Sequence, residues 1–309
     1  METISKTTRC KQSSNDSRYT GLRAFTLLEL LTLIATAIVG GVLLAPALAR
    51  SRPASQAAQC LNNIRQLMNA TAIYTQAHHE MFPPNPDDGN TVPGHGWAAG
   101  YAGKGGGSEF NPDILANPSL SPLSTYLRSN VSVFACAADL RQGLYQGTDP
   151  RKLGTTVRAA RSVSMNSAVG NVCPTFANSC SEHSGGPSIP VVGTWLTGRH
   201  SCSPSAWRTY GKTSDMVNPS PSSLFVLIEE DPWSINDSVL AFSAGMPQWI
   251  DYPSGLHNFA GIVTFADTHG ELHKWVERST RLNDWPTLRL ISPNDRDWLW
   301  LRARTTTQR

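Results

Sequence analysis

A single carboxylate, Glu29, stands inside an apolar run that begins at Phe25 and lasts to about Ala49. No other charged residue interrupts this run before Arg50. An ionised group in apolar surroundings costs free energy unless a group of opposite charge offsets it. Glu29 therefore calls for a positively charged partner, which the apolar run itself does not supply.

Cysteines are the second group of residues with chemistry of their own. Six occur, and those that follow the apolar run are Cys60, Cys136, Cys173, Cys180 and Cys202. The last three lie close together in a stretch rich in Gly, Pro and Ser, as the cysteines of a disulfide-bonded loop do. A zinc site that adds His183 and His200 is the alternative, but the spacing matches no standard ligand pattern. We therefore expect disulfides among the five cysteines and no metal.

Oxygen-bearing side chains gather in the segment 229–237, where Asp231, Asn236 and Asp237 are candidate calcium ligands. Calcium takes about six to eight oxygen ligands. The segment does not match an EF-hand, and acidic loops are commonly just solvated. We expect no cofactor, with calcium as the alternative.

Four residues with metal-binding side chains alternate near the C-terminus, namely Asp267, His269, Glu271 and His273. In an extended chain they would share one face, as the ligands of a metal site could. Gly270 breaks this alternation. We therefore expect a hairpin turn, in which Asp267 bonds turn amides, followed by a solvated strand face.

No enzyme motif is present. The chain lacks Gly-x-Ser-x-Gly, His-Glu-x-x-His and a phosphate-binding loop, so no catalytic residue is predicted. The formal net charge of +3 is too small to indicate nucleic acid as a partner. Only 16% of residues are charged, and glycines and prolines are frequent, which favours a loop-rich and partly β domain.

Helical periodicity continues past the apolar run. Over 57–74, apolar residues recur every three or four positions with polar residues between them. We expect one helix from Phe25 to about His79, ended by the proline-rich segment 83–86. Pro46 is expected to kink this helix, because an interior proline removes a backbone hydrogen bond.

Several short segments have the composition of strands. The continuous apolar run 223–229 predicts a buried central strand. Runs 261–266 and 271–276 flank a turn, which predicts a β-hairpin. Further expected elements are a short helix over 121–127, strands over 131–136 and 161–166, and loops over 83–111 and 170–205.

The basic N-terminal segment followed by the apolar run allows three interpretations. A secretory signal peptide has an apolar core of about 7–15 residues, shorter than the run seen here. A plain signal anchor fits the length, because about 20 apolar residues cross a bilayer. Neither accounts for Glu29. The third interpretation is a prepilin, cleaved between Ala24 and Phe25. It accounts for both the length of the apolar run and the presence of Glu29, and it is favoured.

With these parts assembled, the chain resembles the pseudopilin-like proteins that combine a prepilin N-terminus with a C-terminal H-x9-DG domain. They are related to the major pseudopilin of type II secretion. His257 is followed by nine residues and then Asp267, with Thr268 in place of the usual Gly. Weaker matches lie at 60–67, 134–139, 164–166 and 265–270.

The resemblance implies an α+β, pilin-like, loop-rich fold in which a long N-terminal helix, transmembrane in its first half, packs on an antiparallel β-sheet. The implied domains are a cytoplasmic leader over 1–24, a transmembrane helix over 25–49, a helix extension over 50–82, and an extracytoplasmic globular domain over 83–309 with the H-x9-D region at 257–267. The implied localisation is the inner membrane, single-pass, with the C-terminal domain periplasmic or extracellular.

The resemblance also implies the function of a structural pseudopilin subunit in a type II secretion or type IV pilus-like filament. A prepilin peptidase would cleave before Phe25, whose amine would be methylated, although Ala24 stands where Gly is usual. In the filament, Glu29 of one subunit would pair with the Phe25 amine of a neighbour. Implied partners are other pseudopilin subunits, the prepilin peptidase, an inner-membrane assembly platform and membrane lipid. The alternatives are a membrane-anchored extracytoplasmic binding module for sugar, peptide or DNA that is not built into a filament, and an exported hydrolase.

Overall fold

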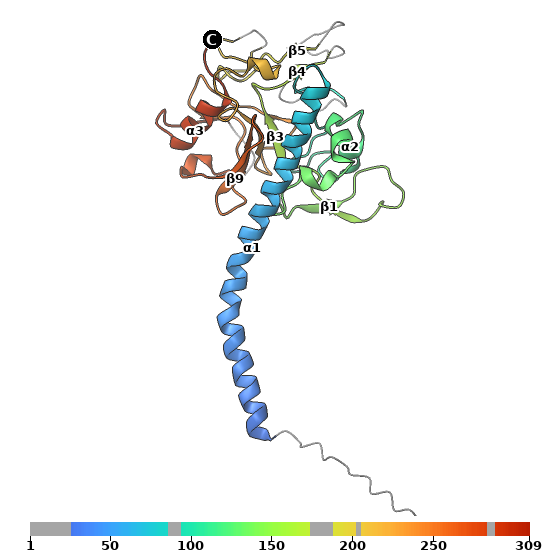
Figure 1. The fold of residues 1–309 in the computed structure, drawn as a ribbon, viewed down its shortest axis with the longest axis vertical. Helices are drawn as coiled ribbons and strands as arrows, with labels where there is room; N and C mark the ends of the chain where they lie inside the picture. The colour runs from blue at the N-terminus through green and yellow to red at the C-terminus, as the bar shows by residue number, and fades with distance from the viewer. Residues whose placement is uncertain (1–25, 86–93, 174–187, 202–204, 283–287) are drawn as a thin grey trace, which may run out of the picture. The chain divides into compact units, whose positions relative to one another are not determined.

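The computed structural model describes residues 26–85, 94–173, 188–201, 205–282 and 288–309 (Figure 1). Two compact units divide the chain, one formed by Met1–Ala49 and the other by Arg50–Arg309. Helix α1, Leu27–Ala77, contributes its first part to one unit and its second part to the other. The expected N-terminal helix is therefore present, and it ends two residues before His79.

The prediction that the first part of this helix crosses a membrane depends on its length and apolar composition. Among the residues that the structure describes, no helix combines the length and the apolar composition needed to cross a membrane. The predicted transmembrane helix over 25–49 and the single-pass inner-membrane localisation are therefore wrong.

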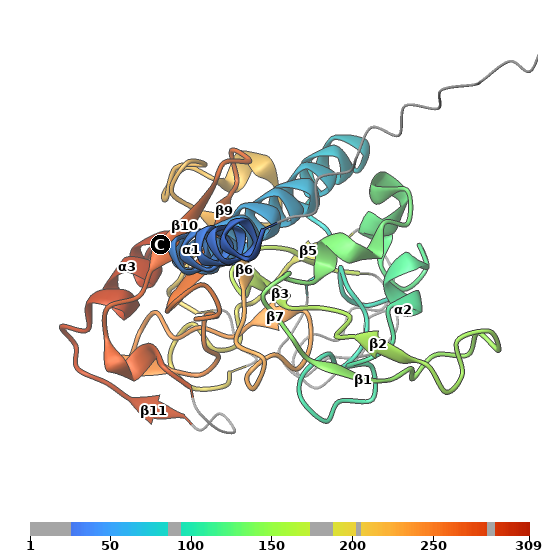
Figure 2. The same cartoon turned by 90° about the horizontal axis from the view of Figure 1, so that it is seen from below.

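The main sheet has five strands in the order β10-β9-β6-β3-β7, and Figure 2 shows the labelled strands following one another in this order. Its members are β3 (Val163–Asn166), β6 (Phe225–Glu229), β7 (Val239–Leu240), β9 (Ala260–Phe265) and β10 (Gly270–Lys274). The predicted central strand is confirmed as β6, which is buried along its whole length between β9 and β3. The predicted hairpin is confirmed as the antiparallel pair of β9 and β10.

The fold class that we predicted is wrong in a second respect. Strands β3 and β7 pair in parallel, Met165 with Val239 and Asn166 with Leu240, so the sheet is mixed and the fold is mixed α/β with several sheets. The expected strand over 131–136 is also wrong, because a 3-10 helix forms at Val131–Phe134. There the Asn130 side chain accepts a hydrogen bond from the Ser132 amide, which favours a helical turn over an extended chain.

The remaining described elements are short. The helical ones are α2 (Asp113–Ala116), η1 (Pro122–Leu127), η2 (Val131–Phe134), η3 (Thr213–Asp215), η4 (Arg278–Thr280) and α3 (Arg296–Thr305). The strands form three two-stranded sheets: β1 (Gln142–Leu144) with β2 (Thr156–Arg158), β4 (Asn171–Val172) with β5 (Ile189–Pro190), and β8 (Gln248–Trp249) with β11 (Arg289–Leu290). Element η1 matches the short helix expected over 121–127.

The core of unit Arg50–Arg309 forms where the second part of α1 meets the sheet. Ile64, Leu67 and Met68, spaced three or four residues apart, lie in one buried apolar cluster with the residues of β6 and β9. This spacing places them on one helical face. Burying that face holds the α1 backbone, and therefore Cys60 one turn before Ile64, against the sheet.

Candidate functional site

The N-terminal end of α1 carries a reciprocal pair of hydrogen bonds between Thr26 and Glu29. The Thr26 amide and Oγ1 both donate to Glu29 Oε2 at 2.9 Å, and the Glu29 amide donates to Thr26 Oγ1 at 3.2 Å. This is a capping box, which satisfies amides that a helix start leaves without a partner. The hydrogen bond from the Thr26 backbone lowers the pKa of Glu29 below its ordinary value, so the carboxylate is charged at neutral pH. Glu29 therefore has a local structural role in capping the helix, which differs from the predicted role in assembly.

Apolar side chains next to Glu29 are exposed in unit Met1–Ala49. They are Leu27, Leu28, Leu30, Leu31, Leu33, Ile34, Ile38 and Val39, each at least 48% exposed. Because they occupy successive positions rather than one stripe, they point to several sides of the helix. A large exposed apolar surface of this kind marks an interaction site.

Ala24 and Phe25, the two predicted processing residues, lie outside the residues that the structure describes. Pro46 lies within α1, which is continuous from Leu27 to Ala77.

A second group of reactive side chains lies in the interior of the other unit. Cys60 comes from α1, and Cys136 follows η2 by two residues. Their Sγ atoms are 2.7 Å apart, and both side chains are almost fully buried. The two Sγ atoms are not joined by a disulfide bond, which is about 2.05 Å long, but they lie closer together than two unlinked thiols normally do. The helix and the η2 segment thus meet at a pair of thiols.

His257 and Glu229 complete this group. His257 Nε2 lies 3.2 Å from Cys136 Sγ and 3.2 Å from Glu229 Oε2, and both residues are buried. Glu229 is the last residue of β6, and His257 precedes β9 by three residues. The ligand atoms of Cys60, Cys136, Glu229 and His257 all lie within 4.8 Å of one another. We call these four residues the CCEH cluster.

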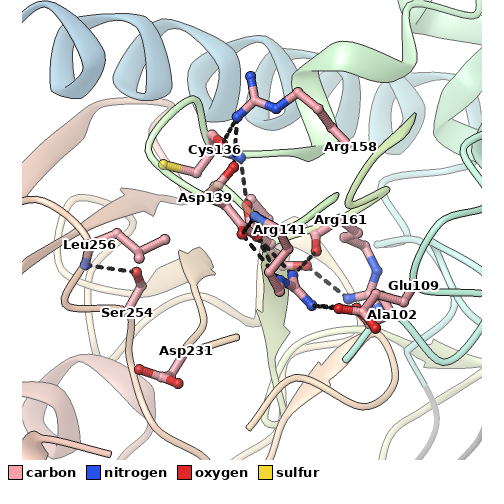
Figure 3. Close-up of polar contacts among 12 residues, drawn as sticks. Ala102, Glu109, Cys136, Asp139, Arg141, Arg158, Arg161, Asp231, Ser254 and Leu256 are labelled. Carbon is pink, nitrogen blue, oxygen red and sulfur yellow. Dashed lines mark hydrogen bonds and ion pairs between the residues drawn. The ribbon is translucent and has the colours of Figure 1, made fainter. Parts of the chain in front are cut away.

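Backbone amides and an arginine position the Cys136 side of the cluster. The Ala137 amide donates to Cys60 Sγ at 2.8 Å, and the Ala138 amide donates to Cys136 Sγ at 3.3 Å. Figure 3 shows Arg158 beside this segment, where its Nη2 donates to the carbonyl oxygens of Cys136, Ala137 and Asp139. The segment 136–139 is therefore fixed by two sets of hydrogen bonds: its amides donate to the cysteine sulfurs, and its carbonyl oxygens accept from Arg158.

A buried ion-pair network extends from the same segment (Figure 3). Arg141 donates to the carboxylate of Asp139 at 2.8 Å and to Glu109 at 3.1 Å, and it also donates to the carbonyl oxygens of Ala102 and Arg161. Asp139 and Glu109 are almost fully buried. Since a buried carboxylate without a partner is costly, Arg141 fixes the fold of the chain that follows Cys136.

The cluster alters the pKa values of its own members. A hydrogen bond from Cys136 lowers the pKa of Cys60 to about 6, although burial raises it. The same hydrogen bond, together with burial, raises the pKa of Cys136. Burial lowers the pKa of His257, but hydrogen bonds to Cys60 and Glu229 outweigh that effect and raise it to about 9. These shifts favour the charged forms of Cys60 and His257 next to each other.

The two residues of the H-x9-D motif have separate surroundings. His257 belongs to the CCEH cluster, whereas Asp267 lies in the exposed turn between β9 and β10. Asp267 Oδ1 accepts hydrogen bonds from the His269 amide at 3.2 Å and from His269 Nδ1 at 2.5 Å. His273 instead stacks on Trp300, with ring centroids 3.6 Å apart. The expected hairpin turn is therefore confirmed, whereas the expected solvated strand face is not seen at His273, because its ring packs on Trp300.

The candidate calcium residues each use an oxygen to support the loop after β6. Asp231, Asn236 and Asp237 accept hydrogen bonds through Oδ1 from the amides of Trp233, Asp237 and Val239, respectively. Burial raises the pKa of Asp231 to about 6.

Of the five cysteines considered for disulfides, Cys60 and Cys136 are brought together. Cys173 is partly buried at the end of a described range, and Cys180 and Cys202 lie outside the described residues. His183 lies outside them as well, while His200 packs edge-on against Trp195.

From the sequence, Cys60, Cys136 and His257 are separate candidate residues that nothing places together, and Glu229 is not among the predicted site residues. Their separations along the chain, 76 residues between the cysteines and 121 between Cys136 and His257, carry no ligand-spacing signal. The only available signal was that all three lie in motifs of the pseudopilin resemblance. Comparison with protein-family models, with curated proteins and with solved structures finds no match to this chain, so that resemblance stays a prediction.

Proposed function

We propose that this protein is a structural subunit that polymerises with further copies of itself through the first part of α1, as a pseudopilin of a type II secretion or type IV pilus-like filament does. The observation that carries the proposal is the exposed apolar surface from Leu27 to Val39 with a single carboxylate, Glu29, among its side chains. Burying this surface would remove a large apolar area from water.

A second copy of the same helix is the partner that fits this surface best. Apolar side chains on several sides of one helix need several neighbouring helices to cover them, and a polymer supplies these neighbours from identical chains. Glu29 then requires a positive group on a neighbour. Cleavage before Phe25 would create one, because the new N-terminal amine would lie at the start of the same apolar segment.

Substitution of the helix surface tests the proposal. Ile34 and Ile38 lie four residues apart, on the same side of the helix, and are 48% and 60% exposed. In cells that process the chain, the double variant Ile34→Gln/Ile38→Gln should abolish filaments in negative-stain electron microscopy and leave the protein folded.

A matched control is available at Val217 and Leu290, which are 77% and 72% exposed and lie far from α1 in the sequence. The double variant Val217→Gln/Leu290→Gln makes the same chemical change outside the helix and should polymerise normally. Normal filaments from the Ile34/Ile38 variant would refute the proposal.

A further inference from the structure

We propose that the CCEH cluster binds one thiophilic divalent metal ion, zinc, through the Sγ atoms of Cys60 and Cys136, Nε2 of His257 and a carboxylate oxygen of Glu229. The proposal is independent of polymerisation, since the cluster lies in unit Arg50–Arg309.

The types of ligand atom select the metal. Zinc binds cysteine sulfur, histidine nitrogen and carboxylate oxygen, and its structural sites are tetrahedral with four protein ligands. The cluster offers two sulfurs, one nitrogen and one carboxylate within 4.8 Å of one another. Calcium and magnesium prefer oxygen ligands alone, so the two thiols exclude them.

Burial indicates a closed, structural site. Cys60, Cys136 and Glu229 are at most 2% exposed, and His257 is 6% exposed. Four protein ligands without a solvent-exposed position are typical of structural zinc and not of catalytic zinc. The ligands come from α1, the segment after η2, the end of β6 and the segment before β9, so a metal ion would join four parts of the fold.

The distances are close to those of a tetrahedral site for three of the ligands. With metal–ligand bonds of about 2.0–2.3 Å, neighbouring ligand atoms lie about 3.3–3.8 Å apart. His257 Nε2 is 3.2 Å from both Cys136 Sγ and Glu229 Oε2. The two sulfurs, at 2.7 Å, would have to separate by about 1 Å.

Hydrogen bonds around the ligands support the same assignment. The Ala137 and Ala138 amides donate to the two sulfurs, as amides do to metal-bound thiolates. The Ile262 amide donates to Glu229 Oε2 at 3.1 Å and orients that carboxylate. A disulfide between the cysteines would use only two of the four groups, and His257 and Glu229 would then pair with each other alone.

A cavity of about 220 Å³ lies next to the two cysteines in the sequence: Gln59, which precedes Cys60, and Ala135 and Ala137, which flank Cys136, line it. Binding would displace the remaining thiol and imidazole protons to solvent, leaving two thiolates and a neutral histidine as ligands.

Metal analysis of the full-length chain tests the proposal. The protein is purified with a phosphine reductant and without chelator, then loaded with zinc alone and desalted. We expect about one zinc per chain by mass spectrometry of the elements, and a higher melting temperature than that of the metal-free chain. Cobalt(II) should give the intense absorption of a tetrahedral thiolate complex.

Variants assign the ligands. Cys136→Ser and His257→Ala should each lose the bound zinc and the thiolate-to-cobalt absorption, whereas Cys173→Ser, the same change at a cysteine outside the cluster, should retain both. If the ligand variants do not fold, the cobalt spectrum of the unmodified chain still decides, because absence of thiolate absorption overturns the proposal. A Cys60–Cys136 disulfide in the protein isolated without reductant, combined with failure of the reduced chain to bind zinc, also overturns it.

Discussion

Glu29 and Thr26 cap the first turn of α1 by donating to and accepting from each other, with the Thr26 amide 2.9 Å from Glu29 Oε2 and the Glu29 amide 3.2 Å from Thr26 Oγ1. A carboxylate that looks anomalous in an apolar segment thus has a structural role even in the single chain. The proposed polymer requires a second role, the charge itself, and the two roles can be separated by mutation.

Glu29→Gln should keep the capping box and remove the charge, because Gln can accept the same hydrogen bond. Thr26→Ala should remove the hydroxyl cap, at a cost of about 0.5–2 kcal/mol to the helix start, and keep the charge. We expect Glu29→Gln to reduce polymerisation at least tenfold in a sedimentation assay and Thr26→Ala to polymerise nearly normally. The reverse pattern would mean that Glu29 acts only as a cap.

Arg141 should be essential for the stability of unit Arg50–Arg309. Arg141→Met leaves Asp139 and Glu109 buried without their positive partner, so the free energy of unfolding should fall by about 3–5 kcal/mol in urea. Arg151 pairs with Asp149 at the surface, where its side chain is 88% exposed. Arg151→Met should therefore change stability by less than about 0.5 kcal/mol, and equal effects of the two variants would contradict this account.

His273 should make the unit less stable in acid. Burial beside Trp300 lowers the pKa of His273 below 6.5, although nearby Glu271 opposes the shift. A lowered pKa in the folded state means that the stabilising contribution of neutral His273 is present above pH 6.5 and is lost as the pH falls below that value.

His273→Phe keeps the stacking on Trp300 and cannot be protonated. We therefore expect its melting temperature to fall less than that of the unmodified protein between pH 7.5 and pH 5. His200→Phe makes the same change at a histidine that packs edge-on against Trp195, and it serves as the control. An identical pH dependence in the His273 variant would refute the prediction.

The sequence predicted those elements whose signal is local. The unbroken apolar run before Glu229 identified β6, and the turn around Asp267 identified the β9–β10 hairpin. The segment Val131–Phe134 was predicted wrongly, because a short apolar run does not distinguish a strand from a 3-10 helix. The parallel pairing of β3 with β7 depends on contacts distant in sequence, which periodicity does not report.

In the candidate sites, too, local signals could be predicted from the sequence and contacts between distant residues could not. Glu29 could be identified from the sequence because a single charge in an apolar run is a local signal. Its capping partner Thr26 was not predicted, although Thr-x-x-Glu is the sequence pattern of a capping box. The CCEH cluster could not be predicted, because its members meet only when α1 packs on the sheet. The transmembrane prediction failed because it relied on composition over 25–49, while the structure gives no helix among its described residues that could cross a membrane.

Photo-crosslinking from α1 tests the central claim most directly. A photoreactive amino acid at Leu31, which is 55% exposed, should crosslink two copies of the chain, with the crosslinked peptide of the second copy lying within 26–49. The same probe at Leu290, which is 72% exposed in β11, should give no such product. Crosslinks from Leu31 only to residues 50–309, or none between copies in cells that process the chain, would contradict polymerisation through this helix.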